Sequence, residues 1–460
     1  MKARIVPDNP FTCPPSLAVN PENQKYPKLK SHSIEKIQKA VNVKPQEVAT
    51  VVLSFVYFFC LLCSYYILRP VRDEMGVLGG IENLQWLFTG TFIVMLLVVP
   101  LFGAAAARFP RRTLLPGVYL FFIANILLFA VLVKIAPSAR AIPYAFFIWV
   151  SVFNLFVVSV FWSFMADIFS NQQAKRLFAV IAAGGSAGAI CGPLLTAFLA
   201  QRLGIGNLLF MSAGFLLIAT VCVTVLGRLA TNGEPQNQAA ALGGKAWEGL
   251  QNVLKSPYLL GICVYIFLFT TLSTFLYFMQ AELVRDAFES SERRTAVFAT
   301  IDLAVNALTI ILQLFVTSRL ITRFGLPVTL ALIPGLLILG FIGLGLLPTL
   351  VVLVAIQVTR RAGNYAITKP AREILFTVVK REDKYKSKSF IDTVVYRGGD
   401  ALSGWLYAGL AALGLGLAGI AGIGAGLAII WLIVGVKLGQ RHDGLAQRIQ
   451  PATVSSALTE

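Results

Sequence analysis

The chain has 460 residues, of which 57% are hydrophobic and only 13% are charged. Soluble domains carry roughly 25% charged residues, so this composition excludes an ordinary soluble protein. The formal net charge is +17, but the Lys and Arg residues fall mainly in segments predicted to lie on one side of a membrane. That bias follows the positive-inside rule, so the basic excess indicates topology and no nucleic-acid partner is expected.

Long apolar segments recur along the chain, each close to the roughly 20 residues that cross a bilayer as a helix. Because these segments are continuous rather than alternating, they predict helices and not barrel strands. The predicted spans cover residues 48–67, 84–106, 113–134, 143–165, 177–200, 206–228, 258–280, 296–318, 326–347, 349–376, 390–412 and 415–437. The expected fold is an all-α integral membrane protein with twelve transmembrane helices in two six-helix bundles.

Polar segments divide the chain into five predicted parts. These are a cytoplasmic N-terminal tail at 1–47, a first bundle at 48–229, a cytoplasmic linker at 230–257, a second bundle at 258–437 and a cytoplasmic C-terminal tail at 438–460. Residues 1–47 lack the apolar core of a secretory signal. We expect a monomer in the lipid bilayer of a bacterial inner (plasma) membrane, with both termini in the cytoplasm.

Three short motifs recur in the same order at an interval of about 214 residues. First and second copies are Val71-Arg72-Asp73 and Val284-Arg285-Asp286, Arg108-Phe109 and Arg323-Phe324, and Gly184-Gly185 and Gly398-Gly399. Each pair occupies the same place relative to the surrounding apolar segments. Two parallel copies of a six-helix unit are typical of secondary transporters, whose substrate site lies between the halves.

The basic turns at residues 103–112 and 319–325 resemble the loop that marks the major facilitator superfamily, in which a glycine precedes a basic cluster. Ala107 stands where that loop usually has an aspartate. We expect Arg108 and Arg323 to cap helix ends and to bond a neighbouring span in one gating state. A plain orientation signal is the alternative.

Charged residues inside a span are costly and usually line a cavity or pair with a partner. Arg360 lies about 11 residues, or about 16 Å, into span ten, and Arg361 follows it. In the architecture expected here, spans one, four, seven and ten line the central cavity. Arginine binds phosphate or carboxylate through its planar fork, so both residues are candidate anion-binding groups. A buried pair with an acid on another span is the alternative.

Span eleven carries Asp392, Arg397 and Asp400, and Arg397 is close enough to Asp400 for an intrahelical pair. A structural triad and a substrate site are both compatible with this spacing. Asp302 in span eight is a further candidate for an ion pair. The sequence also offers polar Asn306 and Gln313 in the same span.

The end of span one is predicted to be a charged turn at residues 68–74, which contains Arg69, Arg72, Asp73 and Glu74. This cluster reads either as an interfacial ion network or as a second clamp for an anionic substrate. Tyr66, just before it, would stack on a base or anchor the membrane interface.

Several stretches resemble the ATP/ADP translocase family of plastids and intracellular bacteria, over about residues 48–437. They are Phe58-Phe59-Cys60 through Tyr66-Ile67-Leu68-Arg69 with Arg72-Asp73; Phe161-Trp162-Ser163-Phe164 followed by Ala174-Lys175-Arg176-Leu177-Phe178; and Tyr385-Lys386-Ser387-Lys388 leading to Ile391-Asp392 and Arg397-Gly398-Gly399.

The resemblance implies twelve spans, a fold like that of the major facilitator superfamily, and nucleotide exchange by alternating access. It implies basic residues at Arg72 and Arg397. The family also has acidic residues in spans four and seven, where this chain offers Asn154 and Thr270, Thr271 or Thr274. The chain is therefore similar to a divergent bacterial member of the family.

The sequence thus predicts a secondary transporter for an anionic, phosphorylated solute, with nucleotide exchange as the family default. The candidate substrate-binding residues are Arg72, Arg360, Arg361, Arg397, Asn154 and Tyr66; the candidate gating or ion-pair residues are Asp73, Asp302, Asp392, Asp400, Arg108 and Arg323.

Two competing functions remain open at this stage. One is a proton-coupled carrier of a neutral or amphipathic solute, with Asp302, Asp392 or Asp400 carrying the proton. The other is a non-transporting scaffold. No enzyme activity, cofactor or metal is expected, because the sequence has no phosphate-binding loop and its six cysteines and two histidines form no ligand pattern.

Overall fold

The computed structural model describes residues 43–108, 111–136, 138–229, 253–379, 387–388 and 390–457. All regular structure in these residues is helical. The predictions for most of the N-terminal tail, for the linker up to residue 252 and for the basic loop at 380–386 lie outside the described residues.

The first half contains η1 Pro45–Glu47, α2 Val48–Leu78, η2 Ile81–Asn83, α3 Leu84–Arg108, α4 Arg111–Ile135, α5 Ala141–Ile168 and α6 Asn171–Leu229. The second half begins with α8 Pro257–Ala287, α9 Ser291–Phe315, α10 Thr317–Leu346 and α11 Leu350–Gly363. It continues with η4 Asn364–Thr368, α12 Lys369–Leu375, η5 Phe376–Val378, η6 Ile391–Val395, α14 Tyr396–Ala412 and α15 Leu417–Ala457. Both η4 and η6 are π-helical.

Two of the long helices are interrupted at a glycine. Gly204 within α6 and Gly325 within α10 both have φ of 75°, where glycine meets no steric penalty from a Cβ. They lie between predicted spans five and six and between spans eight and nine. Nine segments of the described residues are long and apolar enough to cross a membrane, and one of them holds both helices of α6. The number of twelve spans therefore stays a prediction.

The charged turn predicted at residues 68–74 is wrong. α2 continues as one helix to Leu78, with Pro70 inside it. The helix persists because Asp73 and Glu74 find partners within the protein and need no water. α8 likewise runs to Ala287, beyond the predicted end of span seven at residue 280, and α15 extends beyond the predicted end of the last span.

Two hydrophobic cores organise the helices. The first contains Tyr57 and Phe153 and belongs to α2, α4, α5 and α6, whereas the second contains Phe341 and Trp431 and belongs chiefly to α8, α10, α11 and α15. These four side chains are fully buried. Most residues of each core come from one half of the chain.

Glycines set the closest helix approaches in both cores. A Cβ at Gly184 of α6 would lie 2.5 Å from the carbonyl oxygen of Phe55 in α2. A Cβ at Gly399 of α14 would collide with Oγ1 of Thr270 in α8. Small residues allow such contact between membrane helices. The second copy of the glycine motif therefore has the packing role of the first.

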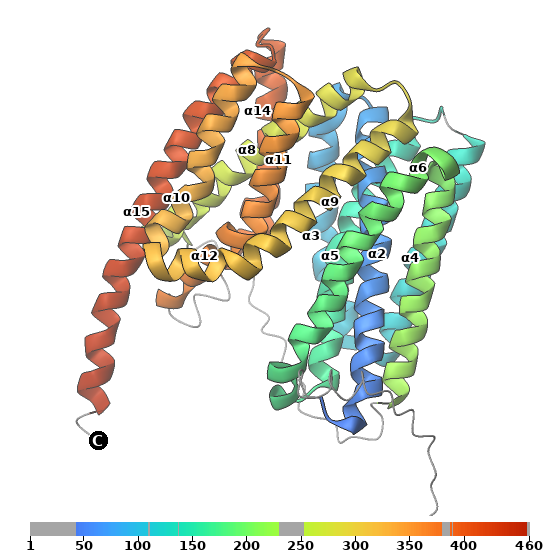
Figure 1. The fold of residues 1–460 in the computed structure, drawn as a ribbon, viewed down its shortest axis with the longest axis horizontal. Coiled ribbons are helices and arrows are strands. Elements are labelled where there is room, and N and C mark those ends of the chain that lie inside the picture. Colours follow the sequence, from blue (N-terminus) through green and yellow to red (C-terminus); the bar gives the residue numbers. More distant parts are fainter. Residues whose placement is uncertain are drawn as a thin grey trace, which may run out of the picture.

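The helices run between two faces, which we call the Pro45 face, where α2 begins, and the Leu78 face, where α2 ends. The two groups of helices lie closer together at the Leu78 face than at the Pro45 face (Figure 1). Hydrophobic contacts agree with this view, because Val77, Leu84 and Leu87 from the first half belong to the second core.

Candidate substrate cavity

A cavity lies between residues of the two halves, with about 960 Å³ of space not filled by atoms, open solvent at its mouth included. Its walls come from α2, α5, α8 and α11 with η4, which are the predicted spans one, four, seven and ten, and also from α3 and α14. Five arginines line it against two aspartates: Arg69, Arg72, Arg360, Arg361 and Arg397, with Asp73 and Asp400.

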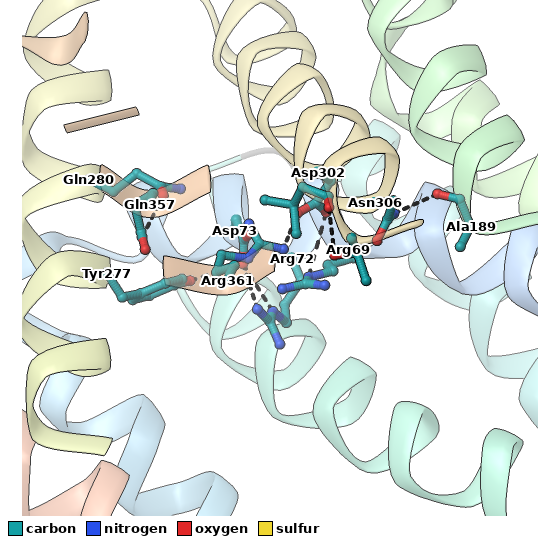
Figure 2. A network of polar contacts seen from close by, with 12 residues as sticks. Arg69, Arg72, Asp73, Ala189, Tyr277, Gln280, Asp302, Asn306, Gln357 and Arg361 are labelled. Carbon is teal, nitrogen blue, oxygen red and sulfur yellow. Dashed lines mark hydrogen bonds and ion pairs between the residues drawn. The ribbon is translucent and has the colours of Figure 1, made fainter. Parts of the chain in front are cut away.

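Asp302 of α9 joins an arginine from each half. Arg361 Nη2 donates to Asp302 Oδ1, and Arg69 Nε lies 3.5 Å from Asp302 Oδ2 (Figure 2). The Asp302 side chain is 1% exposed. For Arg361, the alternative of a buried ion pair with an acid on another span therefore holds. The Nε atoms of Arg69 and Arg361 are buried and donate no hydrogen bond within the described part of the chain, so both groups retain spare donors.

Arg72 is held by its neighbour on α2. Its Nη2 donates to Asp73 Oδ1 over 2.7 Å, and its guanidinium lies 5.2 Å from the ring centre of Phe147. The hydroxyl of Tyr277 on α8 donates to the same Asp73 oxygen over 3.0 Å (Figure 2). This bond links the halves, so the cluster lies at the cavity wall and is more than an interfacial ion network.

Arg360 differs from the other four arginines in its partners. Its Nε and Nη2 donate to Gln357 Oε1 over 3.1 and 2.8 Å, and its Nη1 donates to Ser273 Oγ over 2.5 Å. No carboxylate lies within salt-bridge distance of it among the residues that the structure describes. Arg360 is 5% exposed, so it is a buried positive charge with neutral partners.

The predicted triad of span eleven divides into two pairs. Arg397 Nη1 lies 3.6 Å from Asp400 Oδ2, as the spacing suggests, and both residues line the cavity. Asp392 instead lies 3.0 Å from Arg372 Nη2 of α12, away from the lining residues. Asp392 lies within the π-helical turn η6, which changes the helical phase between it and Arg397.

The other candidates lie outside the lining of this cavity. Asn154 is one turn beyond Ser151 on α5, and Tyr66 packs toward α6, where its Cβ would lie 2.8 Å from a Cβ at Gly192. Arg323 is exposed beside the ring of Phe324, and the side chain of Arg108 is outside the described set.

A buried polar network closes the Leu78 face. Glu74 of α2 is fully buried and accepts hydrogen bonds from Nε and Nη2 of Arg294 on α9, at 2.9 and 2.7 Å. Ser291 donates to the same carboxylate over 2.7 Å. Nearby, Trp86 and Trp405 meet edge to face with ring centres 4.6 Å apart.

Sequence reasoning missed several of these polar residues. Gln357 and Gln280 were not among the candidate residues, although two other uncharged polar residues, Asn306 and Gln313, were. Arg294 was taken as part of a loop. Spacing offered one clue, since Gln357 precedes Arg360 by one helical turn.

Comparison with known proteins gives a consistent class. A model of the Major Facilitator Superfamily matches residues 50–370. The "ADP,ATP carrier protein 1" of Chlamydia muridarum (strain MoPn / Nigg) is 23% identical over 434 residues, covering 79% of this chain and 82% of that protein. The protein of the same name from Chlamydia trachomatis serovar D is 22% identical, covering 86% and 89%.

Solved structures share the fold. A bacterial homologue of the iron transporter ferroportin in an inward-facing state has a TM-score of 0.62 at 12% identity, covering 86% of this chain and all of that one. The POT family transporter PepTSo has a TM-score of 0.61 at 14% identity, covering 85% and 98%. These likenesses confirm the expected all-α, major facilitator-like fold, and the two relatives confirm the resemblance drawn from the motifs.

Proposed function

This chain belongs to the Major Facilitator Superfamily, and we propose that it exchanges anionic, phosphorylated solutes across a membrane by alternating access. The chain is a multi-pass membrane protein whose relatives are transporters. We place the Pro45 face in the cytoplasm of a bacterial cell, following the distribution of basic residues.

Arg360 carries this proposal. A guanidinium buried between neutral partners keeps its full charge, and such a charge in a membrane protein marks a ligand or ion pathway. Two further lining arginines, Arg72 and Arg397, each pair with an aspartate. Their own side chains remain 17% and 30% exposed. An entering phosphate would find donors from both halves of the protein, which is the arrangement that lets one ligand stabilise both open states.

Nucleotide is the substrate class that best fits the remaining lining. Aromatic rings line the same space as the arginines, among them Phe269, Tyr365 and Tyr396. Any nucleotide base can stack on an aromatic side chain, and phosphates accept hydrogen bonds from arginine. The two chlamydial relatives are named for ADP and ATP, which supports this choice.

The contacts at the Leu78 face support a state that is closed there and open toward the Pro45 face. Breaking the Glu74–Arg294 pair is then part of opening the Leu78 face. Because a lone buried carboxylate is costly, this pair must gain water as the face opens.

Exchange in proteoliposomes tests the proposal. Vesicles preloaded with ADP should take up labelled ATP, and empty vesicles should take up far less. A panel of ATP, ADP, AMP and phosphate would rank the substrates. Uptake of a neutral solute that follows an imposed pH gradient, with no need for internal nucleotide, would contradict the proposal and favour a proton-coupled carrier.

Asp302→Asn should lower thermal stability and make it depend on anions. Its loss leaves the charges of Arg69 and Arg361 without a carboxylate, and breaking a buried pair costs about 3–5 kcal/mol. Bound phosphate would replace the lost negative charge. We therefore expect the unfolding temperature of the variant to rise with added phosphate more than that of the wild-type protein does.

Asp286→Asn is the matched control for this measurement. Asp286 pairs with Arg285 over 2.8 Å in the second copy of the same motif, but its side chain is 56% exposed. Solvent screens such a pair, so little change in stability is expected. If phosphate raises the unfolding temperature of both variants equally, phosphate does not bind in the place of the Asp302 carboxylate.

A further inference from the structure

A chain of neutral amides leads from α8 to Arg360. Gln357 Nε2 donates to Gln280 Oε1 over 2.7 Å (Figure 2). Gln357 Oε1 accepts from Arg360. Gln280 and Gln357 are 2% and 1% exposed. Two amides buried to this extent in a membrane protein need a reason, because apolar residues would pack there without the need for hydrogen-bond partners.

The orientation of the Gln357 amide is fixed from both ends. Arg360 can only donate, so it must face the amide oxygen. The backbone carbonyl of Leu276 can only accept, and it lies 3.4 Å from the amide nitrogen. The nitrogen therefore faces α8, and Gln280 must present its own oxygen to it. The bonding order does not depend on how the amides are assigned.

These bonds hold Arg360 without cancelling its charge. Each of the other four lining arginines lies within 3.6 Å of a carboxylate oxygen. An amide oxygen orients a guanidinium as a carboxylate does, but it contributes no negative charge. Of the five N–H donors of Arg360, three are used, which leaves one on each terminal nitrogen for a ligand.

We propose that Gln357, anchored by Gln280, is a specificity-determining residue that makes Arg360 the subsite for the terminal phosphate of the substrate. This inference rests on the proposed function and refines it. Because the subsite has a full positive charge and free N–H donors, it favours a doubly charged phosphate over neutral or singly charged groups. AMP and ADP both end in a doubly charged phosphate, so the gain in affinity from AMP to ADP is assigned to the second phosphate of ADP, which reaches Arg360.

Gln357→Glu tests the inference in the full-length detergent-purified protein. The side chain keeps its size, Gln280 can rotate its amide to donate to the new carboxylate, and Arg360 gains an ion-pair partner. We expect ADP affinity to fall at least about tenfold, because the new charge competes with phosphate at hydrogen-bond distance. The affinity for adenosine should change little. Because the affinity for ADP falls, the ratio of ADP affinity to AMP affinity should become smaller. A merely structural role would weaken all three ligands together.

Ser273→Asp is a second variant. Ser273 lies on α8 and contacts Nη1 of Arg360, so this change places a carboxylate at the opposite end of the guanidinium from Gln357. It should reproduce the loss of ADP preference even if Gln357→Glu does not fold. Gln201→Glu is the matched control, since Gln201 is exposed on α6 and does not line the cavity. Its ADP affinity should equal that of the wild-type protein.

Arg360→Gln separates this inference from the proposed function. If Arg360→Gln weakens ADP binding while Gln357→Glu and Ser273→Asp bind ADP as the wild-type protein does, the role of Gln357 is refuted and the anion cavity stands. If Arg360→Gln also binds ADP normally, or if the wild-type protein binds neither ADP nor AMP, both proposals fail.

Discussion

Exchange of a phosphorylated solute should fall at least about a hundredfold in a variant with Arg360→Ala and Arg361→Ala. Among the described lining residues, the first change removes the one arginine whose partners are all neutral. The second leaves Asp302 paired with Arg69 alone and so removes the net positive charge of this cluster of two arginines and one aspartate. Both effects oppose an anion, and the rate of labelled ADP uptake into preloaded proteoliposomes measures their sum.

Arg285→Ala is the matched control for this loss. Arg285 has the same place in the second copy of the motif as Arg72 has in the first, but its side chain is 45% exposed, and it does not line the cavity. Its removal should leave exchange unchanged. The double variant must elute as a monodisperse protein in gel filtration, since only then does lost uptake report on the cavity. Wild-type exchange in a folded double variant would refute the anion site.

The sequence was sufficient to predict which helices line the cavity and that Arg360 lies among the lining residues. A charge near the middle of a long apolar segment is costly, so its presence alone indicated a site. The partner Gln357 was also within reach of sequence reasoning, because residues three apart share a helix face. What the sequence could not show is that the neighbouring Arg361 is neutralised, since Asp302 lies on a different helix.

The contacts between the halves could not be predicted either, because their partners also lie on different helices. Glu74 and Arg294 are 220 positions apart; Glu74 was predicted to lie in a charged turn, and Arg294 lies between predicted spans seven and eight. Their pairing explains why α2 continues past Pro70. A helix end in a membrane protein is expected where charges need water, but Glu74 finds its donors in α9 instead. Hydropathy describes the cost of a buried charge and does not show which partner offsets it.

Locking the Leu78 face with a disulfide should stop exchange. A Cβ at Gly404 of α14 would lie 3.4 Å from the Cβ of Gln85 on α3, close to the roughly 3.5–4.5 Å of a disulfide. The pair Gln85→Cys and Gly404→Cys, in a chain whose six native cysteines are replaced by alanine, should therefore form a bond across the two halves under mild oxidant. If this face must open in each cycle, ADP uptake falls to background on oxidation and returns on reduction.

A second cross-link distinguishes a blocked motion from a general effect of oxidation. The hydroxyl oxygens of Ser64 on α2 and Ser212 on α6 lie 2.8 Å apart inside the first core. Ser64→Cys with Ser212→Cys should form a disulfide within one half, which moves as a unit in a rocking mechanism, so exchange should persist. If both cysteine pairs transport ADP as fast after oxidation as after reduction, the Leu78 face does not open by separation of α3 from α14. If both stop transport, motion within a half is required, and rigid rocking of the two halves is refuted.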